Sequence, residues 1–477
     1  MKKVLIANRG EIAVRIIRAC HELGLKTVAV YAKEDEYGVH RFRADEAYQI
    51  GAGKKPIEAY LDMDDIIRVA KQTGADAVHP GYGFLAENEE FAQKCADNGI
   101  IFIGPTVRQL QLFGDKVAAK EVAVKAGLKT IPGTDEPVQS IDEVREFAHT
   151  HGYPIMIKAA MGGGGRGMRI VHDDDELDGA YDRARSEAKQ SFGDDELYVE
   201  KYLKNPKHIE VQILADQHGH VMHLFERDCS VQRRNQKVIE FAPSLALSEE
   251  RRQAICQAAV KVMESVHYQN AGTVEFLVTD EDFYFIEVNP RIQVEHTVTE
   301  LITDVDIVQS QILIADGADL YEDLELPAQD QLKYNGYGIQ CRVTTEDPEN
   351  NFMPDTGRIE TYRSPGGMGV RLDGGNAYAG AVITPYFDSL LVKACVHGRT
   401  FKSAVRRMIR VLHEFQIRGI KTNIPFMLNV LHHPVFAAGQ AHTTFIDQTP
   451  ELFDFKHEKP DAAKQLLTYV GDVTVNG

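Results

Sequence analysis

Lys158-Ala159-Ala160-Met161-Gly162-Gly163-Gly164-Gly165-Arg166-Gly167-Met168 is the most informative segment of this chain. Five glycines within six positions have no side chains to pack, so their backbone N–H groups can wrap phosphate oxygens. A Walker A loop is excluded, because that motif needs Lys-Ser or Lys-Thr where this sequence has Met168. The loop connects two predicted strands, 154–160 and 168–171. Together with Lys158 just upstream, this favours a phosphate-covering lid over a flexible hairpin tip.

The composition describes a folded, acidic protein of several domains. The 477 residues include 53 Lys and Arg against 71 Asp and Glu, a formal net charge of −18, and 43% are hydrophobic. At about 150 residues per domain, this length predicts about three domains. The acidic balance argues against nucleic-acid and anionic-membrane binding, because both need a positive surface. No apolar run approaches the roughly 18 residues of a membrane span.

The N-terminus and the cysteines indicate a cytoplasmic protein. The first apolar run is too short for a secretory signal. The cysteines form no Cys-x-x-Cys pair, which favours reduced thiols over zinc or disulfide sites. They are Cys20, Cys95, Cys229, Cys256, Cys341 and Cys395.

The N-terminal part, residues 1–114, alternates predicted strands and helices. This is the pattern of βαβ units, so we predict a Rossmann-like parallel sheet. The strands are expected over 4–8, 27–31, 77–79 and 100–103, with helices over 12–20 and 63–73. Only Gly10 lies at the first turn and the Gly-x-Gly-x-x-Gly fingerprint is absent, so NAD binding is weakly supported.

The rest of the chain predicts an α/β fold with α+β character in its C-terminal half. Residues 115–326 form a second domain, which includes a helix over 115–126 and a small α/β subdomain, 131–204, that carries the glycine-rich loop. Residues 327–450 form a third domain, and 451–477 a tail or linker. Antiparallel strands are expected over 209–214, 221–226, 272–278, 283–289, 338–343, 357–362 and 390–397, and a helix over 401–412.

Two acidic side chains on a predicted hairpin point to a metal site. Glu275 and Glu287 each lie among apolar neighbours on strands joined by a polar loop, 279–282. The hairpin places them roughly opposite one another, where like charges repel unless a cation lies between them. Asn289 shares the face of Glu287, because side chains on a strand repeat every two residues. These oxygen ligands suit Mg²⁺ with bound phosphates, whereas the alternative is solvent-facing acids on an edge strand.

The next motif combines a cation, an amide and a carboxylate. An extended chain after Pro290 would aim Arg291, Gln293 and Glu295 to one side. That set suits a small anion that must lose a proton, with Arg binding the charge and Glu accepting the proton; a surface salt bridge is the alternative. Upstream, four cations within 227–237 indicate a positive pocket rather than a solvated charge run.

Two weaker signals flank these motifs. The segment 200–203 lies between subdomains, where its backbone could pair with an adenine edge. The segment 79–87 is a glycine- and aromatic-rich loop after a strand, and it could equally be a plain turn.

In their order along the chain, these motifs resemble the ATP-grasp biotin carboxylases. The resemblance rests on 158–167, 226–237 and 287–295, supported by 6–13, 79–87, 341–342, 385–389 and 419–423, and it covers about residues 1–450. Residues 466–477 resemble the segment that follows this domain in single-chain pyruvate carboxylases. The resemblance implies an ATP-grasp fold and the MgATP-dependent carboxylation of biotin by bicarbonate through carboxyphosphate.

The resemblance also implies site residues. Glu295 would be the base that deprotonates bicarbonate, and Arg342 would stabilise the biotin enolate. The bicarbonate pocket would comprise Lys237, Arg291, Gln293 and Val294, and the positions near biotin would be Tyr82, Gly83 and Asp388. ATP would contact Lys116, Lys158, Gly163, Gly164, Gly165, Glu200, Lys201, Leu203, His208, Gln232, Asn235 and Leu277. Mg²⁺ or Mn²⁺ would be held by Glu275, Glu287 and Asn289.

The implied partners are a biotin carboxyl carrier domain, a carboxyltransferase domain and a second copy of this domain in a homodimer. Neither of the first two fits in 477 residues, and no Met-Lys-Met biotinylation site is present. One departure is visible: Asn235 stands where the family often has His, so nucleotide affinity or its pH dependence is expected to differ.

Three other readings stay open. The chain could belong to an acyl-CoA or 2-oxoacid carboxylase. It could be another ATP-grasp ligase, of carbamoyl-phosphate or purine synthesis, but Arg342 and Tyr82 would then have no role. It could be an inactive nucleotide-binding domain, but such a domain would not need Glu295.

Overall fold

The structure is a computed structural model that describes residues 1–134, 136–159, 168–192, 195–455, 466, 469–471 and 473–474. The expected ATP contacts Gly163, Gly164 and Gly165 lie outside the described residues, as does most of the tail. Within the described part of the chain, no helix is long and apolar enough to span a membrane.

The N-terminal part is built on a five-stranded parallel sheet in the order β3-β2-β1-β4-β5, which confirms the predicted βαβ pattern. The strands are β1 (Lys3–Ile6), β2 (Lys26–Tyr31), β3 (Glu46–Gln49), β4 (Ala77–His79) and β5 (Ile101–Phe102). The helices are α1 (Gly10–Glu22), η1 (Lys33–Asp35), α2 (Val39–Arg43), α3 (Pro56–Tyr60), α4 (Met63–Thr73), α5 (Glu89–Asp97) and α6 (Val107–Gly114). Local signals fix these helices: α4 begins after Asp62, whose side chain accepts from the Asp65 amide, and ends at left-handed Gly74.

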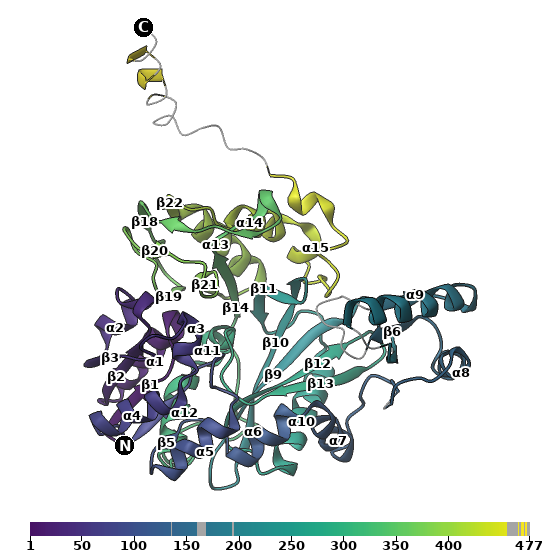
Figure 1. Cartoon of the computed structure of the whole chain (residues 1–477), viewed down its shortest axis with the longest axis horizontal. Coiled ribbons are helices and arrows are strands. Elements are labelled where there is room, and N and C mark those ends of the chain that lie inside the picture. The colour runs from purple at the N-terminus through teal and green to yellow at the C-terminus, as the bar shows by residue number, and fades with distance from the viewer. Residues whose placement is uncertain are drawn as a thin grey trace.

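A small subdomain projects to the right in Figure 1. Its antiparallel sheet, in the order β7-β6-β8, comprises β6 (Ile155–Ala159), β7 (Met168–Val171) and β8 (Leu197–Lys201). Ile155, Ile157 and Ala159 alternate inward and form a core with the helices α8 (Ile141–His151) and α9 (Asp174–Phe192). The subdomain therefore has a core of its own.

A long antiparallel sheet in the order β13-β12-β9-β10-β11-β14-β21-β19 spans the rest of the molecule. Its strands are β9 (Lys207–Ala215), β10 (Val221–Arg233), β11 (Gln236–Ala242), β12 (Asn270–Val278), β13 (Phe283–Asn289), β14 (Tyr337–Thr344), β19 (Val370–Gly374) and β21 (Leu390–Gly398). Strand β10 extends well beyond its predicted end at residue 226, because the charged residues that follow are buried in the sheet.

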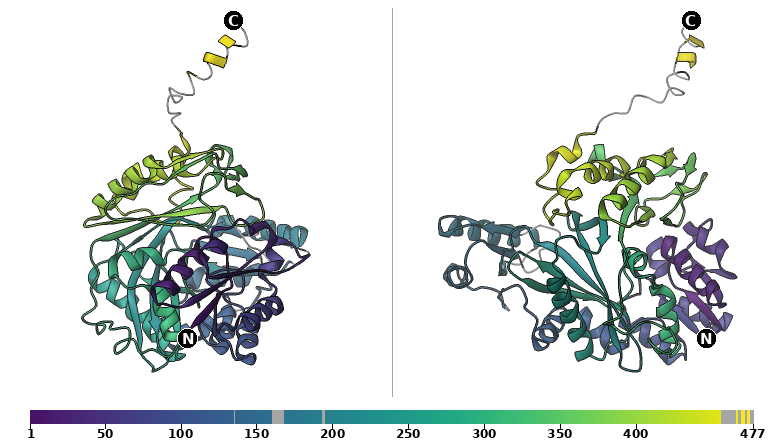
Figure 2. Two further views of the ribbon diagram at one scale, coloured as in Figure 1. Left: turned by 90° about the vertical axis from the view of Figure 1, so that its left-hand side faces the viewer. Right: turned by 180° about the vertical axis from the view of Figure 1, so that it is seen from behind.

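Helices cover this sheet at several places. In the central part these are α7 (Lys116–Lys125), α10 (Glu249–Ser265), α11 (His296–Thr303) and α12 (Ile307–Ala315). In the C-terminal part they are η2 (Pro348–Asn350), α13 (Phe401–Glu414), α14 (Ile424–His432), α15 (Pro434–Ala437) and η3 (Pro450–Phe453). Figure 2 shows the C-terminal helices together at the top of the molecule, where α13 packs against β14 and β21.

The predicted strand over 357–362 is wrong. The chain forms two short strands instead, β17 (Gly357–Arg358) and β18 (Thr361–Arg363), which pair with β20 (Val382–Ile383) and β22 (Gln416–Arg418) respectively. The pairing partner of the chain changes from β20 to β22 after Ile359, whose side chain is fully buried in the C-terminal core. A further short pair, β15 (Glu346–Asp347) and β16 (Met353–Pro354), lies nearby in the sequence.

Candidate active site

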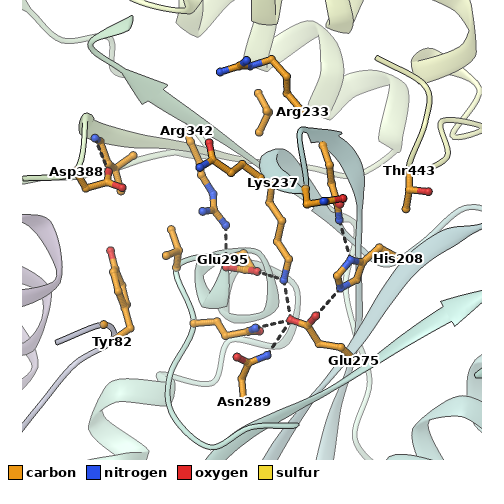
Figure 3. Close-up of a pocket in the computed structure, with 18 of the residues that line it drawn as sticks. Tyr82, His208, Arg233, Lys237, Glu275, Asn289, Glu295, Arg342, Asp388 and Thr443 are labelled. Atoms are coloured by element: carbon orange, nitrogen blue, oxygen red, sulfur yellow. Dashed lines mark hydrogen bonds and ion pairs between the residues drawn. The ribbon is translucent and has the colours of Figure 1, made fainter. Parts of the chain in front are cut away.

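One cavity of about 1200 Å³ lies where the three parts of the molecule meet. Tyr82 enters it from the N-terminal part and Arg342 from β14, while the long sheet forms its floor (Figure 3). Lys158, in β6 of the small subdomain, also lines it. The structure brings nearly all the predicted site residues to this cavity. They are Tyr82, Gly83, Lys158, Glu200, Lys201, Leu203, His208, Gln232, Asn235, Lys237, Glu275, Leu277, Glu287, Asn289, Arg291, Gln293, Val294, Glu295, Arg342 and Asp388.

One end of the cavity, here called the anion end, is defined by Glu295, Lys237 and Arg342. The Lys237 ammonium lies 2.7 Å from one Glu295 carboxylate oxygen, and the Arg342 guanidinium lies 3.0 Å from the other. The Glu295 side chain is only 3% exposed. Burial alone would raise the pKa of Glu295, but the charges of Lys237, Arg342 and Arg227 outweigh it and hold the pKa well below its usual range. Glu295 is therefore ionised and held between two cations.

Two buried carboxylates that sequence analysis missed support these cations. Glu210 accepts from Lys237 at 2.5 Å, and Glu240 accepts from Arg342 at 2.5 Å. Burial would lower the pKa of Lys237, but Glu210, Glu295 and Glu275 raise it well above its usual range. The alternation of His208, Glu210 and Gln212 with apolar residues along β9 was the available signal.

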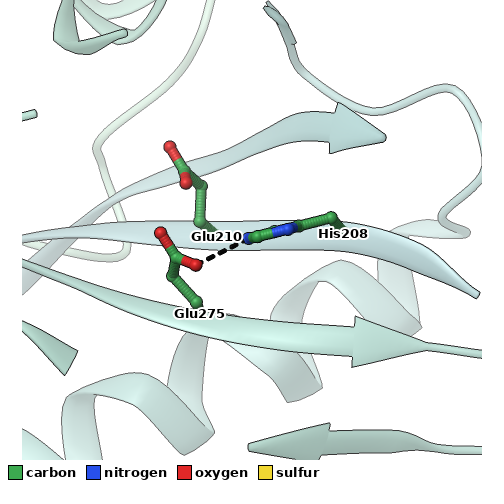
Figure 4. A group of neighbouring side chains, drawn as sticks. All are labelled: His208, Glu210 and Glu275. Carbon is green, nitrogen blue, oxygen red and sulfur yellow. Dashed lines mark hydrogen bonds and ion pairs between the residues drawn. The ribbon is translucent and has the colours of Figure 1, made fainter. Parts of the chain in front are cut away.

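The predicted metal ligands lie on the β12–β13 hairpin, and Glu275 pairs directly with Glu287 in the register, as predicted. Glu275 receives hydrogen bonds from Lys237, Asn289 and Gln293, and its other oxygen lies 2.7 Å from His208 (Figures 3 and 4). Burial would raise the pKa of Glu275, but Lys237 and His208 hold it well below its usual range.

Glu287 has a different environment from Glu275. Within the described part of the chain its carboxylate makes no hydrogen bond or ion pair, and burial and the Glu275 charge together raise its pKa. The Glu287 carboxylate lies beside the Glu275 carboxylate, and a divalent cation bound between them would relieve their repulsion. The side-chain amide oxygen of Asn289, the third predicted ligand, accepts a hydrogen bond from the Arg291 guanidinium at 2.9 Å, so metal binding would compete with that hydrogen bond.

A second part of the cavity, here called the nucleotide end, is lined by more exposed charged side chains. Lys158 and Glu200 form an ion pair with side chains 35% and 22% exposed. Lys201 lines the cavity, but its ammonium donates to the carbonyl oxygens of Gly152 and Tyr153. His208 is oriented by Gln232, whose side-chain nitrogen lies 2.7 Å from the His208 Nδ1 atom. Apolar residues that sequence analysis did not select, Ile131, Met156, Met168 and Ile286, also line the cavity.

Two predicted nucleotide residues have peripheral positions. Lys116 is the first residue of α7, is exposed and does not line the cavity, although its charge lowers the pKa of Glu287. Asn235 lies with Arg234 at the tip of the β10–β11 hairpin, and both have positive φ, 62° and 50°. Asn and Arg thus form the two-residue turn, and Asn is among the residues that tolerate this conformation.

The third side of the cavity carries the residues predicted to lie near biotin. The Tyr82 hydroxyl donates to Glu11, which is buried, and burial raises the pKa of Glu11 to about 7 despite nearby Lys393. Asp388 accepts from the backbone N–H of Leu390 at 2.7 Å. Arg9 stacks on Phe387 at 3.8 Å, beside Asp388. Arg9 and Glu11 lie within the segment 6–13 that supports the family resemblance, but the sequence predicts no role for either.

Comparison with known proteins identifies relatives over the whole chain. Family profiles match residues 1–110 as "Biotin carboxylase, N-terminal domain", residues 115–323 as "Carbamoyl-phosphate synthase L chain, ATP binding domain" and residues 340–448 as "Biotin carboxylase C-terminal domain". Pyruvate carboxylase of Bacillus subtilis (strain 168) is 61% identical over 478 residues, which cover 100% of this chain and 42% of the relative. The chain thus spans less than half the length of that relative.

Two solved structures show the same fold. The biotin carboxylase domain dimer of Hydrogenobacter thermophilus 2-oxoglutarate carboxylase, in complex with MgADP, ADP and bicarbonate, has a TM-score of 0.86 and 47% identity, covering 96% of this chain and 99% of that one. A variant of Rhizobium etli pyruvate carboxylase, with the allosteric activator acetyl coenzyme-A, has a TM-score of 0.87 and 51% identity. That match covers 100% of this chain and 43% of the Rhizobium chain.

Proposed function

The chain belongs to the biotin carboxylase family, and from that premise we propose that it catalyses the MgATP-dependent carboxylation of biotin by bicarbonate as part of a pyruvate carboxylase. The observation that carries the proposal is the anion end of the cavity. There a buried, ionised Glu295 is held by Lys237 and Arg342 and lies in the same cavity as Lys158. A base, cations and a phosphate-binding lysine within one cavity suit the joining of a small oxyanion to a phosphoryl group.

Glu295 is the proposed base, although the neighbouring cations hold its pKa low before bicarbonate binds. Bicarbonate entering between Lys237 and Arg342 would take up part of their charge. Their electrostatic stabilisation of the ionised Glu295 would then weaken, and the pKa of Glu295 would rise. Glu295 would accept the hydroxyl proton of bicarbonate while the resulting oxygen attacks the γ-phosphorus of ATP and ADP leaves. Lys237 and Arg291 would neutralise charge on the reacting oxygens.

Magnesium binding is proposed at Glu275, Glu287 and Asn289. The ion would neutralise negative charge on the phosphate groups of ATP. The surroundings favour it, because the ion pairs of four buried carboxylates (Glu210, Glu240, Glu275 and Glu295) are made, apart from His208, by one buried cation, Arg227, and two partly buried cations, Lys237 and Arg342. Glu287 adds a further negative charge, so added positive charge would be needed before a triphosphate and bicarbonate could enter.

Biotin is proposed to enter from the side of Tyr82, Gly83 and Asp388. Arg342 would serve two substrates in turn, because its guanidinium contacts Glu295 and reaches the same cavity as Tyr82. Glu240 would keep Arg342 oriented when Glu295 takes up the proton. Four further predicted ATP contacts, Leu203, His208, Gln232 and Leu277, line the cavity and would contact the base and ribose side of ATP.

Pyruvate is the proposed final acceptor, supported by 61% identity to the Bacillus subtilis pyruvate carboxylase. A 2-oxoglutarate carboxylase is the second candidate, supported by the fold match to the Hydrogenobacter thermophilus domain. In either case a biotin carboxyl carrier domain and a carboxyltransferase domain would act on the product. A homodimer through this domain and a reducing, cytoplasmic location are also proposed; the six described cysteines are all free thiols and buried.

The test is ADP release by this chain with MgATP and bicarbonate, with and without free biotin. Release that requires both biotin and bicarbonate, and that is abolished in Arg342→Ala, is the expected result. Release that is indifferent to biotin would show that another acceptor is used. ATP binding without release would show a non-catalytic domain.

A further inference from the structure

Arg227 is buried in the protein interior, although the sequence predicted that the four cations within 227–237 form a positive pocket. Its side chain is fully buried within β10 and does not line the cavity. It lies behind the anion end, where it contacts side chains of β9, β12, α11 and the loop that carries Gln293.

All five N–H donors of Arg227 are used. The Nε atom donates to Glu210 at 2.5 Å, one terminal nitrogen donates to Gln212 and Thr299 at 2.7 and 2.9 Å, and the other donates to Thr273 and Gln293 at 3.1 and 2.6 Å. A planar guanidinium alone can satisfy five acceptors in this arrangement, whereas a lysine ammonium has three donors.

Two of these contacts are with side chains beside the anion end: Gln293, of the predicted bicarbonate pocket, and Glu210, which pairs with Lys237. The side-chain amide oxygen of Gln293 accepts a hydrogen bond from Arg227. The side-chain amide nitrogen therefore faces the cavity, where it donates to Glu275 at 2.9 Å. A flipped amide would place its NH₂ group against the guanidinium. Glu210 uses one oxygen for Arg227 and the other for Lys237, so Arg227 also sets the position of the Lys237 ammonium.

A third contact fixes the helix that carries the base. Thr299 lies in α11, and Glu295 is the residue that precedes the first turn of this helix. We propose that Arg227 is a positioning residue for the bicarbonate site: it orients the Gln293 amide, the Lys237 ammonium and the start of α11 without touching substrate. This inference rests on the proposed function and deepens it.

The main test compares Arg227→Lys with Arg252→Lys, a matched control. Arg252 is also buried and paired with a buried carboxylate, Glu226, but it does not line the cavity or contact a residue of the anion end. In Arg227→Lys we expect the KM for bicarbonate in biotin-dependent ADP release to rise about tenfold to a hundredfold, because several charge-assisted hydrogen bonds are lost. The Kd for ADP measured without Mg²⁺ should stay within about twofold, because the five acceptors of Arg227 do not include Lys158, Glu200 or His208.

A purely structural role would give a different pattern. In that case all the kinetic constants and the melting temperature of Arg227→Lys would change together, as in Arg252→Lys. An unchanged KM for bicarbonate in folded Arg227→Lys would overturn the inference while leaving the proposed function standing. Absence of bicarbonate-dependent ADP release by the unchanged chain would instead overturn the proposed function, and this inference with it.

A milder variant covers the case in which Arg227→Lys does not fold. Thr299→Val keeps the shape of the side chain and removes one acceptor of Arg227. It should raise the KM for bicarbonate about threefold to tenfold with nucleotide binding unchanged, as expected for one lost hydrogen bond to a charged group. In the double variant Thr299→Val/Gln293→Ala, the two losses should be less than multiplicative; a full product would show that the residues act independently and would count against the proposal.

Discussion

The anion end and the nucleotide end of the cavity differ in how deeply their charged side chains are buried and in how many partners each has. At the anion end Lys237 and Glu295 have side chains 14% and 3% exposed, and each makes several ion pairs or hydrogen bonds. At the nucleotide end Lys158 has Glu200 as its ion-pair partner, and both are more exposed. The anion end is thus assembled by the fold before substrate arrives, whereas the nucleotide end depends on charges that the ligand brings.

The largest effect is expected from Glu295→Gln, which removes the proposed base and keeps its shape. Bicarbonate-dependent ADP release should fall by about 10²- to 10⁴-fold, the usual contribution of general base catalysis. The Kd for MgADP, measured by calorimetry, should change less than about threefold, because Glu295 lies at the other end of the cavity. Glu240→Gln is the control: it also removes a partner of Arg342, but it lies outside the cavity lining, so its effect should be smaller. Activity within tenfold of the unchanged chain would remove Glu295 from the mechanism.

The second prediction changes the nucleotide end alone. Lys158→Met should raise the KM for ATP about tenfold to a hundredfold, the loss expected for a charge-assisted phosphate contact, and leave the KM for bicarbonate unchanged. Lys201→Met is the matched control, since the Lys201 ammonium is bound by the Gly152 and Tyr153 carbonyl oxygens. Equal effects of the two variants on the KM for ATP would contradict the assignment of Lys158 to phosphate binding.

The third prediction concerns pH and magnesium. The pKa of Glu287 is raised, so its carboxyl group binds a proton at pH values where an ordinary glutamate is ionised. Metal must displace that proton, and therefore the Mg²⁺ concentration for half-maximal ADP release should increase as pH falls through this raised pKa. Glu287→Gln should need more Mg²⁺ at every pH and lose this pH dependence. Magnesium titrations of ADP release between about pH 5 and 8 measure both effects; a pH dependence that persists in the variant would exclude Glu287 as its source.

The sequence predicted the β12–β13 hairpin well but not the charges behind the anion end. The polar loop 279–282 between two apolar runs was sufficient to place Glu275 opposite Glu287. Arg227, by contrast, was read as part of a positive pocket, and the structure buries it in β10. Its partners come from β9, β12 and α11, so its role depends on strand pairing that no local pattern specifies. Glu210 and Glu240 were missed for the same reason.

The same limit applies to the third side of the cavity. Tyr82 and Glu11 are 71 positions apart, and their hydrogen bond follows only from the parallel pairing of β1 with β4, which brings the segments after these two strands together. By contrast, helices such as α4 were predicted over their full length, because apolar spacing and a terminal glycine are local signals.

The smallest effect is expected from Asn235→His at the hairpin tip. Asn and His both tolerate the left-handed backbone found there, so the fold should be unaffected. The variant adds a titratable group at the rim of the cavity, and we expect the Kd for MgADP to change by no more than about threefold, with a pH dependence near the usual histidine pKa. Identical affinity and identical pH dependence in both proteins would show that the substitution is silent.

The long sheet has a consequence for dissecting this protein into fragments. Strand β11 pairs on one side with β10 and on the other with β14, which lies about a hundred residues further along the chain, from Ile239 opposite Cys341 to Ala242 opposite Gly338. A fragment ending at residue 326 would leave β11 as an open edge, with unpaired backbone groups and the apolar side chains of Ile239 and Phe241 newly exposed. Open apolar edges recruit other chains, so such a fragment should self-associate and would be a poor starting point for isolating an ATP-binding unit.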